Sequence, residues 1–136
     1  MNREELKKIL PHREPMLLLD EAVAENNTAA GKYLVRGDEF FLQGHFPGSP
    51  VVPGVIVCEM MAQSACVLLK DELHEGKKTL YTGIDKARFR SPVYPGDQVE
   101  ISCSILRERD PFYFARGTVS VNKKVCAAAD FSFALI

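Results

Sequence analysis

One apolar stretch constrains the fold more than any other part of this 136-residue chain. From Val55 to Leu69 there is almost no polar face, and Glu59 is the only charged residue. With Gly76 as its end, the pattern predicts a helix of roughly 20 residues, about 30 Å long. A helix that is apolar on nearly every side has to be wrapped by other structure. The rest of the chain must therefore provide a surface that surrounds it.

Strand-like segments make up most of the remaining sequence. We expect a helix at Asn2–Leu10, a loop at Gly37–Gly54, and strands at Met16–Ala24, Thr28–Val35, Thr79–Phe89, Gln98–Glu108, Phe112–Val121 and Val125–Leu135. Short turns between neighbouring strands imply an antiparallel meander. The expected fold is α+β and hotdog-like, with a curved sheet of about six strands around one long central helix. Residues 1–136 should form a single domain.

One copy of this layout leaves an edge strand and the flanks of the helix exposed. Pairing two copies edge to edge removes the exposed edge, so we expect at least a homodimer.

Composition and charge exclude several classes of function. The net charge is −1, so we expect no nucleic-acid partner and no membrane insertion. The run from Val55 to Leu69 is shorter than the roughly 20 residues of a membrane-spanning helix, and the charged N-terminus is unlike a secretory signal. The four cysteines form no Cys-x-x-Cys pair and have no histidine at zinc-ligand spacing. This predicts reduced thiols, no metal site and a cytoplasmic protein.

A loop stiffened by prolines places a histidine shortly before the helix. His45 follows Gly44 and precedes a segment with three prolines, ending at Gly54. A neutral imidazole is the usual general base near neutral pH. A backbone carbonyl of the same loop, for example that of Val51, can hold the second ring nitrogen. We therefore interpret His45 as a candidate catalytic base.

Three residues at the start of the helix complete the candidate site. Glu59 is a carboxylate among apolar neighbours, so it should be paired, protonated or lining a cavity, where it can donate a proton. Gly54 opens the helix, where backbone N–H groups lack intrahelical partners and can bind a developing enolate oxygen. Gln63 lies one turn beyond Glu59 on the same face and can orient it. For each of these residues, and for His45, a purely structural role is the alternative.

A base, an acid and an oxyanion donor around an apolar cavity suit one reaction class. They can remove a proton α to a carbonyl while a β-hydroxyl group departs. The sequence shows no phosphate-binding loop, dinucleotide fingerprint or metal cluster, so the expected reaction uses no cofactor. It also lacks a serine nucleophile elbow. A thioesterase that activates water with His45 and Glu59 is an alternative, as is a protein that only binds acyl chains.

Four sequence blocks resemble one known family. They are Leu10–Asp20, Gln43–Gly54, Glu59–Gln63 and Lys86–Asp97. In this order, and over essentially the whole chain, they are similar to the (3R)-hydroxyacyl-[acyl-carrier-protein] dehydratases of the FabZ type. The sister dehydratase/isomerases of the FabA type carry Asp where this chain has Glu59, which favours the plain dehydratase. A dehydratase/isomerase is the alternative, because the two side chains differ by only one methylene. Glu14 and Met16 depart from the aromatic residues often found after Pro-His-Arg.

The resemblance implies dehydration of 3-hydroxyacyl carrier-protein thioesters to trans-2-enoyl products in type II fatty acid synthesis. It implies dimers, often assembled as trimers of dimers, in which His45 of one subunit faces Glu59 of the other. By resemblance, His45 takes the α-proton, Glu59 assists the leaving hydroxyl and the N–H of Gly54 holds the thioester carbonyl. The carbonyl of Val51 would fix the histidine tautomer. A hydratase acting on coenzyme A esters remains a further alternative.

The implied partner, acyl carrier protein, is acidic and needs a basic patch on a chain of nearly neutral charge. Lys86, Arg88 and Arg90 alternate along a predicted strand and would share one face. We expect this face to meet the carrier protein; a solvated strand face is the alternative.

Overall fold

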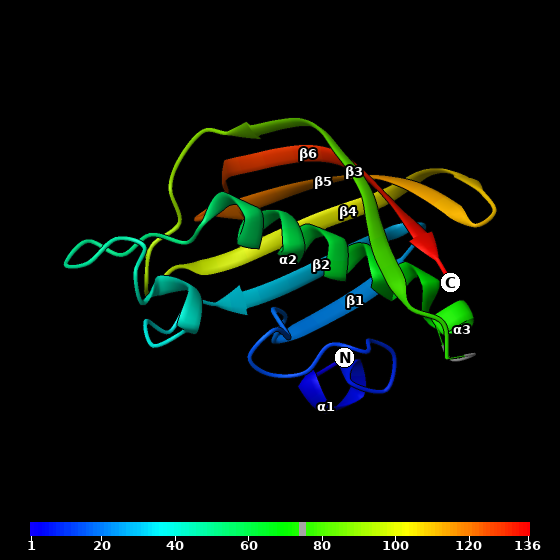
Figure 1. Ribbon diagram of the computed structural model, residues 1–136, viewed down its shortest axis with the longest axis horizontal. Coiled ribbons are helices and arrows are strands. Elements are labelled where there is room, and N and C mark those ends of the chain that lie inside the picture. Colours follow the sequence, from blue (N-terminus) through cyan, green and yellow to red (C-terminus); the bar gives the residue numbers. More distant parts are fainter. Residues whose placement is uncertain (74–75) are drawn as a thin grey trace.

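The computed structural model describes residues 1–73 and 76–136 and contains a curved antiparallel sheet with a helical segment along one face (Figure 1). The strands are β1 (Glu21–Glu25), β2 (Thr28–Leu34), β3 (Thr79–Phe89), β4 (Gln98–Arg109), β5 (Phe112–Val121) and β6 (Lys124–Leu135). The helical elements are α1 (Arg3–Leu6), η1 (Phe40–Leu42), α2 (Gly54–Cys66), η2 (Val67–Leu69) and α3 (Lys70–Leu73). The α+β hotdog architecture expected from the sequence is confirmed.

The strand order is β1-β2-β4-β5-β6-β3, and every neighbouring pair is antiparallel. β4, β5 and β6 form the expected meander, and β1 and β2 form a hairpin. The meander prediction is wrong for β3, which pairs with β6 at the far edge instead of with β4. The reason is that α2 carries the chain across the sheet after β2, so β3 begins on the other side (Figure 1).

The central helix forms where it was predicted, but its geometry is not uniform. It begins at Gly54 as α2, tightens into the 3-10 turn η2, and continues as α3 to Leu73. Residues 74 and 75 lie outside the described part of the chain. Gly76, the predicted end, has φ +81°, and its N–H donates to the carbonyl of Leu73 at 3.1 Å. Glycine is favoured in this left-handed conformation beyond a helix end.

Two glycines allow the helix to lie close to the sheet. A Cβ added at Gly31 of β2 would lie 2.6 Å from Oγ of Ser64 on α2. A Cβ at Gly117 of β5 would lie 2.8 Å from Sγ of Cys103 and 3.0 Å from Sδ of Met61. Larger residues at these two strand positions would push the helix outward, because protein interiors leave little free volume.

The N-terminal helix is shorter than the predicted Asn2–Leu10. α1 begins with a capping box, in which the Asn2 side chain accepts from the N–H of Glu5 and the Glu5 side chain accepts from the N–H of Asn2. After Leu6 the chain continues in turns. The capping box explains why a helix starts here. After Leu6 the N–H groups of Lys8 and Ile9 donate to the carbonyls three residues back, those of Glu5 and Leu6, so the α-helical pattern ends.

The first predicted strand, Met16–Ala24, is wrong in its first part. β1 begins only at Glu21, because Leu17, Leu18 and Leu19 are all buried, with at most 1% exposed. Three consecutive buried residues do not fit a strand that covers the core with one face only. They form a loop packed beside α2.

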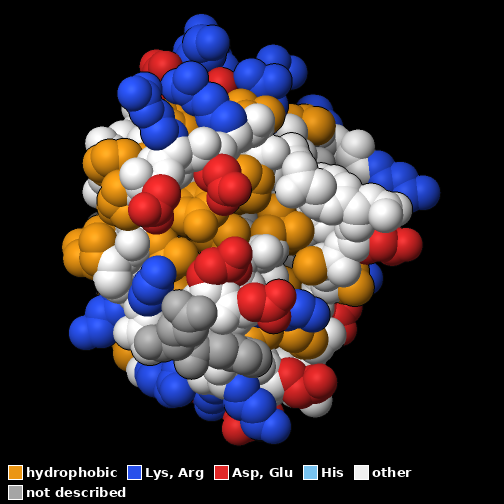
Figure 2. Space-filling model, turned by 90° about the vertical axis from the view of Figure 1, so that its right-hand side faces the viewer, with side chains coloured by type: hydrophobic (Ala, Val, Ile, Leu, Met, Phe, Trp, Pro, Cys, Tyr) orange, Lys and Arg blue, Asp and Glu red, His pale blue; other side chains and the backbone are white. Residues whose placement is uncertain are grey.

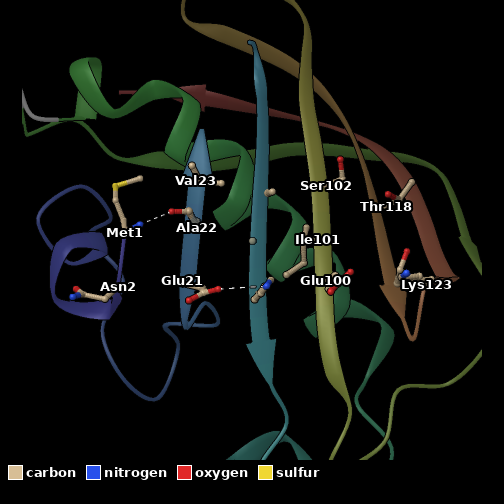
Figure 3. A pocket seen from close by; sticks show the side chains of 14 residues that line it. Met1, Asn2, Glu21, Ala22, Val23, Glu100, Ile101, Ser102, Thr118 and Lys123 are labelled. Atoms are coloured by element: carbon tan, nitrogen blue, oxygen red, sulfur yellow. Dashed lines mark hydrogen bonds and ion pairs between the residues drawn. The ribbon is translucent and has the colours of Figure 1, made fainter. Parts of the chain in front are cut away.

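Most side chains on the sheet face away from α2 are small or polar, although Val23 and Leu34 are exposed there. Along β4 the buried Ile101 alternates with Glu100 and Ser102, which point to the outer face. A groove of about 650 Å³ crosses β1, β2 and β4 on this side (Figure 3). The strands therefore show the alternation of a sheet that buries one face.

β3 is an edge strand, and none of its positions is buried. Its apolar side chains include Leu80, Ile84 and Phe89, of which 53%, 47% and 55% are exposed. On the side of the molecule that includes α3 and the C-terminus, hydrophobic side chains form a broad area below a group of Lys and Arg (Figure 2). In a single copy, much apolar surface thus remains uncovered.

The described residues include no helix that is long and apolar enough to cross a membrane. The four cysteines are free and buried, as the sequence predicted. In the same part of the chain, no group of three His, Cys, Asp or Glu side chains could hold a metal ion.

Candidate active site

The loop before α2 folds back on itself and fixes the ring of His45. The His45 carbonyl accepts a 2.7 Å hydrogen bond from the N–H of Val51, and ring Nδ1 lies 3.0 Å from the Val51 carbonyl oxygen. The Phe46 ring stacks on the imidazole, with 4.2 Å between centroids. Because a carbonyl oxygen only accepts hydrogen bonds, Nδ1 is the ring nitrogen that carries the hydrogen in the neutral imidazole, and Nε2 then holds the lone pair.

Gly54 is the first residue of α2. The first hydrogen bonds of the helix are donated by the N–H groups of Ile56 and Val57 to the Pro53 carbonyl, at 3.0 and 3.2 Å. The N–H of Gly54 precedes them, at the positive end of the helix dipole. A Cβ at this position would lie 3.0 Å from the ring of Phe89. A cavity of about 370 Å³ adjoins this helix start and the end of β3.

Glu59 lies on α2 with 19% of its side chain exposed. Its Oε1 accepts a 3.1 Å hydrogen bond from Nε2 of Gln63, so the contact expected from their spacing is present. The same oxygen lies 3.3 Å from Nε2 of His12. Gln63 is completely buried; it also donates to the Met16 carbonyl at 2.7 Å and accepts from the N–H of Leu18 at 2.9 Å. Gln63 thereby ties the N-terminal segment to α2.

A small pocket of about 30 Å³ lies beside Glu59 and is lined partly by Tyr81 and Cys66. The Tyr81 hydroxyl donates to the Cys58 carbonyl at 2.8 Å. Burial, with a further contribution from the charge of Glu59, raises the pKa of Tyr81. Burial also raises the pKa of the Cys66 thiol to about 12. Both groups stay protonated near neutral pH, so these walls of the pocket are uncharged.

Neither His12 nor Tyr81 was assigned a role from the sequence. His12 is far from Glu59 along the chain, and no helical or strand periodicity links them. The one available signal for His12 is its place between Pro11 and Arg13 in the first resembling block. Tyr81 falls within the predicted strand Thr79–Phe89, where nothing in the sequence distinguishes it from a residue that only packs against the core.

The structure does not bring His45 and Glu59 together within one chain. Among the described residues no contact joins them, and the pocket beside Glu59 is lined without His45. The loop that carries His45 extends beyond the start of α2, away from the sheet (Figure 1).

The three basic residues proposed for docking are exposed, but they do not alternate regularly. A β-bulge falls between Asp85 and Arg88, and Lys86 within it has φ +52°. Arg90 follows the end of β3 at Phe89. The premise that all three share one strand face is wrong, because one extra residue in a strand shifts the side-chain alternation.

A family model described as a FabA-like domain matches residues 10–130. The chain belongs to the FabA-like family. Among its FabA-like relatives, a "3-hydroxyacyl-[acyl-carrier-protein] dehydratase FabZ" from Halalkalibacterium halodurans is 43% identical over 135 residues, which cover 97% of this chain and 96% of the relative. A protein of the same name from Clostridium beijerinckii is 39% identical over 140 residues, covering 99% of each.

Solved structures agree with the fold of this FabA-like chain. The dehydratase heterocomplex ApeI:P from Xenorhabdus doucetiae aligns with a TM-score of 0.81 at 22% identity, over 96% of this chain and 90% of that one. The PaaI protein of the E. coli phenylacetic acid degradation operon aligns with a TM-score of 0.64 at 11% identity, over 84% and 81%. At these identities the likeness concerns the fold alone.

Proposed function

We propose that this chain is a 3-hydroxyacyl-[acyl-carrier-protein] dehydratase of type II fatty acid biosynthesis. It converts a (3R)-3-hydroxyacyl thioester to the trans-2-enoyl thioester and water. The observation that carries the proposal is the near-full-length similarity, 43% and 39% identity, to proteins of that name. Loss of water involves no net oxidation or reduction, so the reaction requires no redox cofactor.

His45 is the proposed base. The contact between its Nδ1 and the Val51 carbonyl supports Nε2 as the proton acceptor. Nε2 takes the α-proton, and the electron pair of the C–H bond moves toward the thioester carbonyl. The N–H of Gly54 donates to the carbonyl oxygen as negative charge develops there, which is where such a donor lowers the barrier most.

Glu59 is the proposed acid. Its carboxyl gives a proton to the β-hydroxyl while the C–O bond breaks, the Cα–Cβ double bond forms and water leaves. Gln63 orients this carboxyl through the hydrogen bond to Oε1. After one turnover His45 holds the extra proton and Glu59 the negative charge, and return of the proton restores both groups.

The proposed site is shared between two copies, with His45 of one subunit facing Glu59 of the other. We propose a homodimer, with a trimer of dimers as the larger assembly. The missing contact between His45 and Glu59 in the described chain supports this arrangement. The free edge of β3, with apolar Leu80 and Ile84 exposed along it, supports it independently, because unpaired edges are usually covered or paired.

The proposed contact with acyl carrier protein comprises Lys86, Arg88 and Arg90. All three are exposed, and the bulge sends Lys86 and Arg88 toward different sides. The patch therefore lies at the end of β3, beyond the Leu80 and Ile84 positions proposed for subunit contact, and not on one sheet face.

We also propose that residues 1–136 form one domain that acts in the cytoplasm. The helical segment and the sheet share one hydrophobic core. The free thiols of the four cysteines are typical of proteins from reducing compartments.

The assay that tests this function uses the purified protein with (3R)-3-hydroxyacyl carrier protein. Ultraviolet absorbance follows the enoyl thioester, and a thiol reagent follows thioester cleavage. Enoyl product without free thiol is expected. Thiol release without enoyl product would identify a thioesterase instead, and a 3-enoyl product would identify a dehydratase/isomerase.

A further inference from the structure

We infer that His12 is a positioning residue for Glu59. It holds Oε1 of the carboxyl together with Gln63, so that Oε2 is the oxygen that gives its proton to the substrate. The inference rests on the proposed function, because it concerns the residue proposed there as the acid.

Two nitrogen atoms from distant parts of the chain lie near the same oxygen. Nε2 of Gln63, on α2, is 3.1 Å from Oε1 of Glu59, and Nε2 of His12, in the N-terminal segment, is 3.3 Å from it. The three hydrogen bonds of the Gln63 amide fix its orientation, since its oxygen accepts from Leu18 and its nitrogen donates to Met16. Oε1 therefore acts as an acceptor, and a proton on the carboxyl belongs on Oε2.

The remaining ring nitrogen of His12 agrees with this arrangement. Nδ1 is buried, and among the described residues it has no hydrogen-bond partner. If Nε2 carries the hydrogen toward Oε1, Nδ1 holds only a lone pair. An unpaired buried acceptor is tolerated more often than an unpaired buried N–H.

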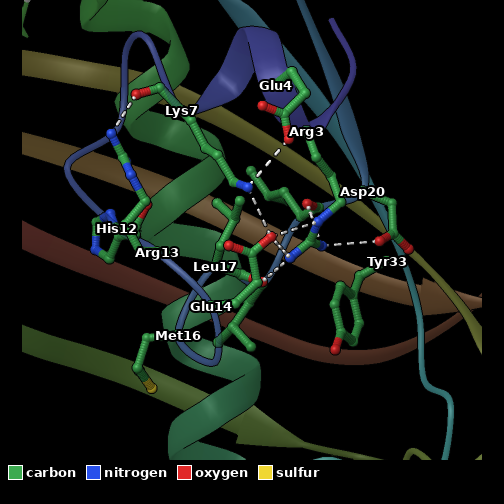
Figure 4. Close-up of polar contacts among 12 residues, drawn as sticks. Arg3, Glu4, Lys7, His12, Arg13, Glu14, Met16, Leu17, Asp20 and Tyr33 are labelled. Atoms are coloured by element: carbon green, nitrogen blue, oxygen red, sulfur yellow. Dashed lines mark hydrogen bonds and ion pairs between the residues drawn. The ribbon is translucent and has the colours of Figure 1, made fainter.

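Hydrogen bonds and ion pairs hold the chain segments before and after His12 in place. Arg13 donates to three carbonyl oxygens of the preceding turn, at 3.0, 2.9 and 2.7 Å, those of Lys7, Leu10 and His12. Glu14 in turn contacts Arg3 and Lys7, each at 3.1 Å (Figure 4). Gln63 binds the chain just beyond, at Met16 and Leu18. His12 is thus attached to a rigid support.

The hydrogen bond from Gln63 and the 3.3 Å contact of His12 Nε2, both at Oε1, together restrict rotation of the Glu59 carboxyl. Without His12, Glu59 keeps the Gln63 contact but can swing about it. A misplacement of about 1 Å in a reacting group can cost on the order of 100-fold in rate. The effect should fall on kcat, because His12 acts through Glu59 and not on the bound thioester.

The test compares three substitutions at position 12 in the full-length protein. His12→Leu removes the donor, and His12→Asn keeps an amide that is too short to reach Glu59. His12→Gln places an N–H close to the position of the histidine Nε2. We expect kcat to fall about 10- to 100-fold in the Leu and Asn variants with KM nearly unchanged, and to recover to within a few-fold in the Gln variant. Glu25→Gln, an exposed change at the end of β1 that is no part of this support, should retain kcat.

A double-mutant cycle separates positioning from general damage. In a Glu59→Gln background, His12→Leu should cause no further loss, because the group it positions is gone. Unchanged kcat in folded Leu and Asn variants, equal losses in both backgrounds, or no recovery with Gln would each overturn the inference. If His12→Leu melts at a lower temperature or loses its assembly state, the test uses the kcat values of His12→Asn and His12→Gln alone. A wild-type protein that forms no enoyl product overturns the proposed function itself, which is a different result.

Discussion

His45 and Glu59, the two side chains proposed to react, each have two polar atoms, and in each case one of the two is held by a neighbouring group. Nδ1 of His45 faces the Val51 carbonyl at 3.0 Å, and Oε1 of Glu59 accepts from Gln63 at 3.1 Å. In both cases the second atom of the group remains for the substrate. Groups fixed in this way need little reorganisation when a proton moves.

Removing either group should abolish most of the elimination. We expect His45→Ala and Glu59→Gln each to lower kcat by about 10²- to 10⁴-fold, the usual contribution of one general acid or base. Turnover of the hydroxyacyl carrier protein measures the loss, and the melting temperature checks the fold. Near-wild-type kcat in either folded variant would contradict the proposed roles.

The sequence predicted those contacts of the candidate site that are local. Gln63 lies one helical turn from Glu59, so their spacing brings them together. Val51 lies in the same loop as His45, and the family resemblance pointed to its carbonyl in particular. His12 was missed because its approach to Glu59 depends on how a loop of buried leucines packs beside α2. No local pattern encodes a contact of that kind.

Glu14 makes the stability of the N-terminal segment depend on pH. The N–H of Glu14 itself, then Lys7 and Arg3, hold the pKa of its carboxyl at about 2, below the ordinary 4.5. A lowered pKa in the folded state means that this stabilisation is present above about pH 4.5 and is lost as the pH falls toward 2. Because the side chain is half exposed, the effect should be small and weakened by salt.

Thermal unfolding between pH 4.5 and 2 measures how much the ionised Glu14 side chain contributes to stability. The melting temperature of the wild type should fall more steeply between pH 4.5 and 2 than that of Glu14→Gln, whose neutral amide does not titrate. Parallel curves for the two proteins would show that Glu14 is not coupled to folding.

At the scale of the elements, hydrophobic pattern predicted the helix and most strand bounds. β3 and β5 begin and end where the sequence placed them, since alternation and turn residues are local. Two errors have non-local causes. The place of β3 in the sheet, beside β6, depends on α2 carrying the chain across the sheet. The bulge at Lys86 interrupts an alternation of side chains that looks regular in the sequence.

The close packing of α2 on β2 leads to a stability prediction. In Gly31→Ala the new Cβ would meet Oγ of Ser64 at 2.6 Å and Cδ2 of Leu19 at 2.9 Å, so the variant should lose about 1–3 kcal/mol by overpacking. Denaturant unfolding measures the loss, and adding Ser64→Ala should recover part of it. Gly44→Ala, where a Cβ meets nothing within 4 Å, is the matched control. An unchanged midpoint for Gly31→Ala would contradict this account of the packing.

The basic end of the β3 edge, beyond the bulge that follows Asp85, provides the test of carrier-protein docking. Replacing Lys86, Arg88 and Arg90 with Glu should raise KM for the carrier-protein substrate about tenfold or more, because each charge steers an acidic partner. A small thioester substrate should be unaffected. Lys32→Glu, an exposed change on β2 near the opposite edge of the sheet, should leave both KM values unchanged. Equal effects on the large and small substrates would rule out docking at this edge.

For the whole molecule, the exposed edge of β3 and the separation of His45 from Glu59 point to the same requirement. A single copy leaves apolar side chains of β3 uncovered and leaves the proposed base without contact to the proposed acid. Pairing two copies can satisfy both. The sequence indicated the need for a partner through its edge strand, and the family resemblance implied a shared site. The described part of the folded chain agrees, because no contact joins His45 and Glu59 in it.

Mixed subunits test whether the site is shared. A dimer of one His45→Ala and one Glu59→Gln chain contains one site with both wild-type groups and one site with neither, if each site draws on two copies. Random mixing of equal amounts makes half of the dimers mixed, so activity should return to about a quarter of the wild-type value. Co-expression with two affinity tags isolates the mixed dimers, which should reach about half. If both groups acted within one chain, every site would lack one of them, and the mixture would stay as inactive as the parent variants.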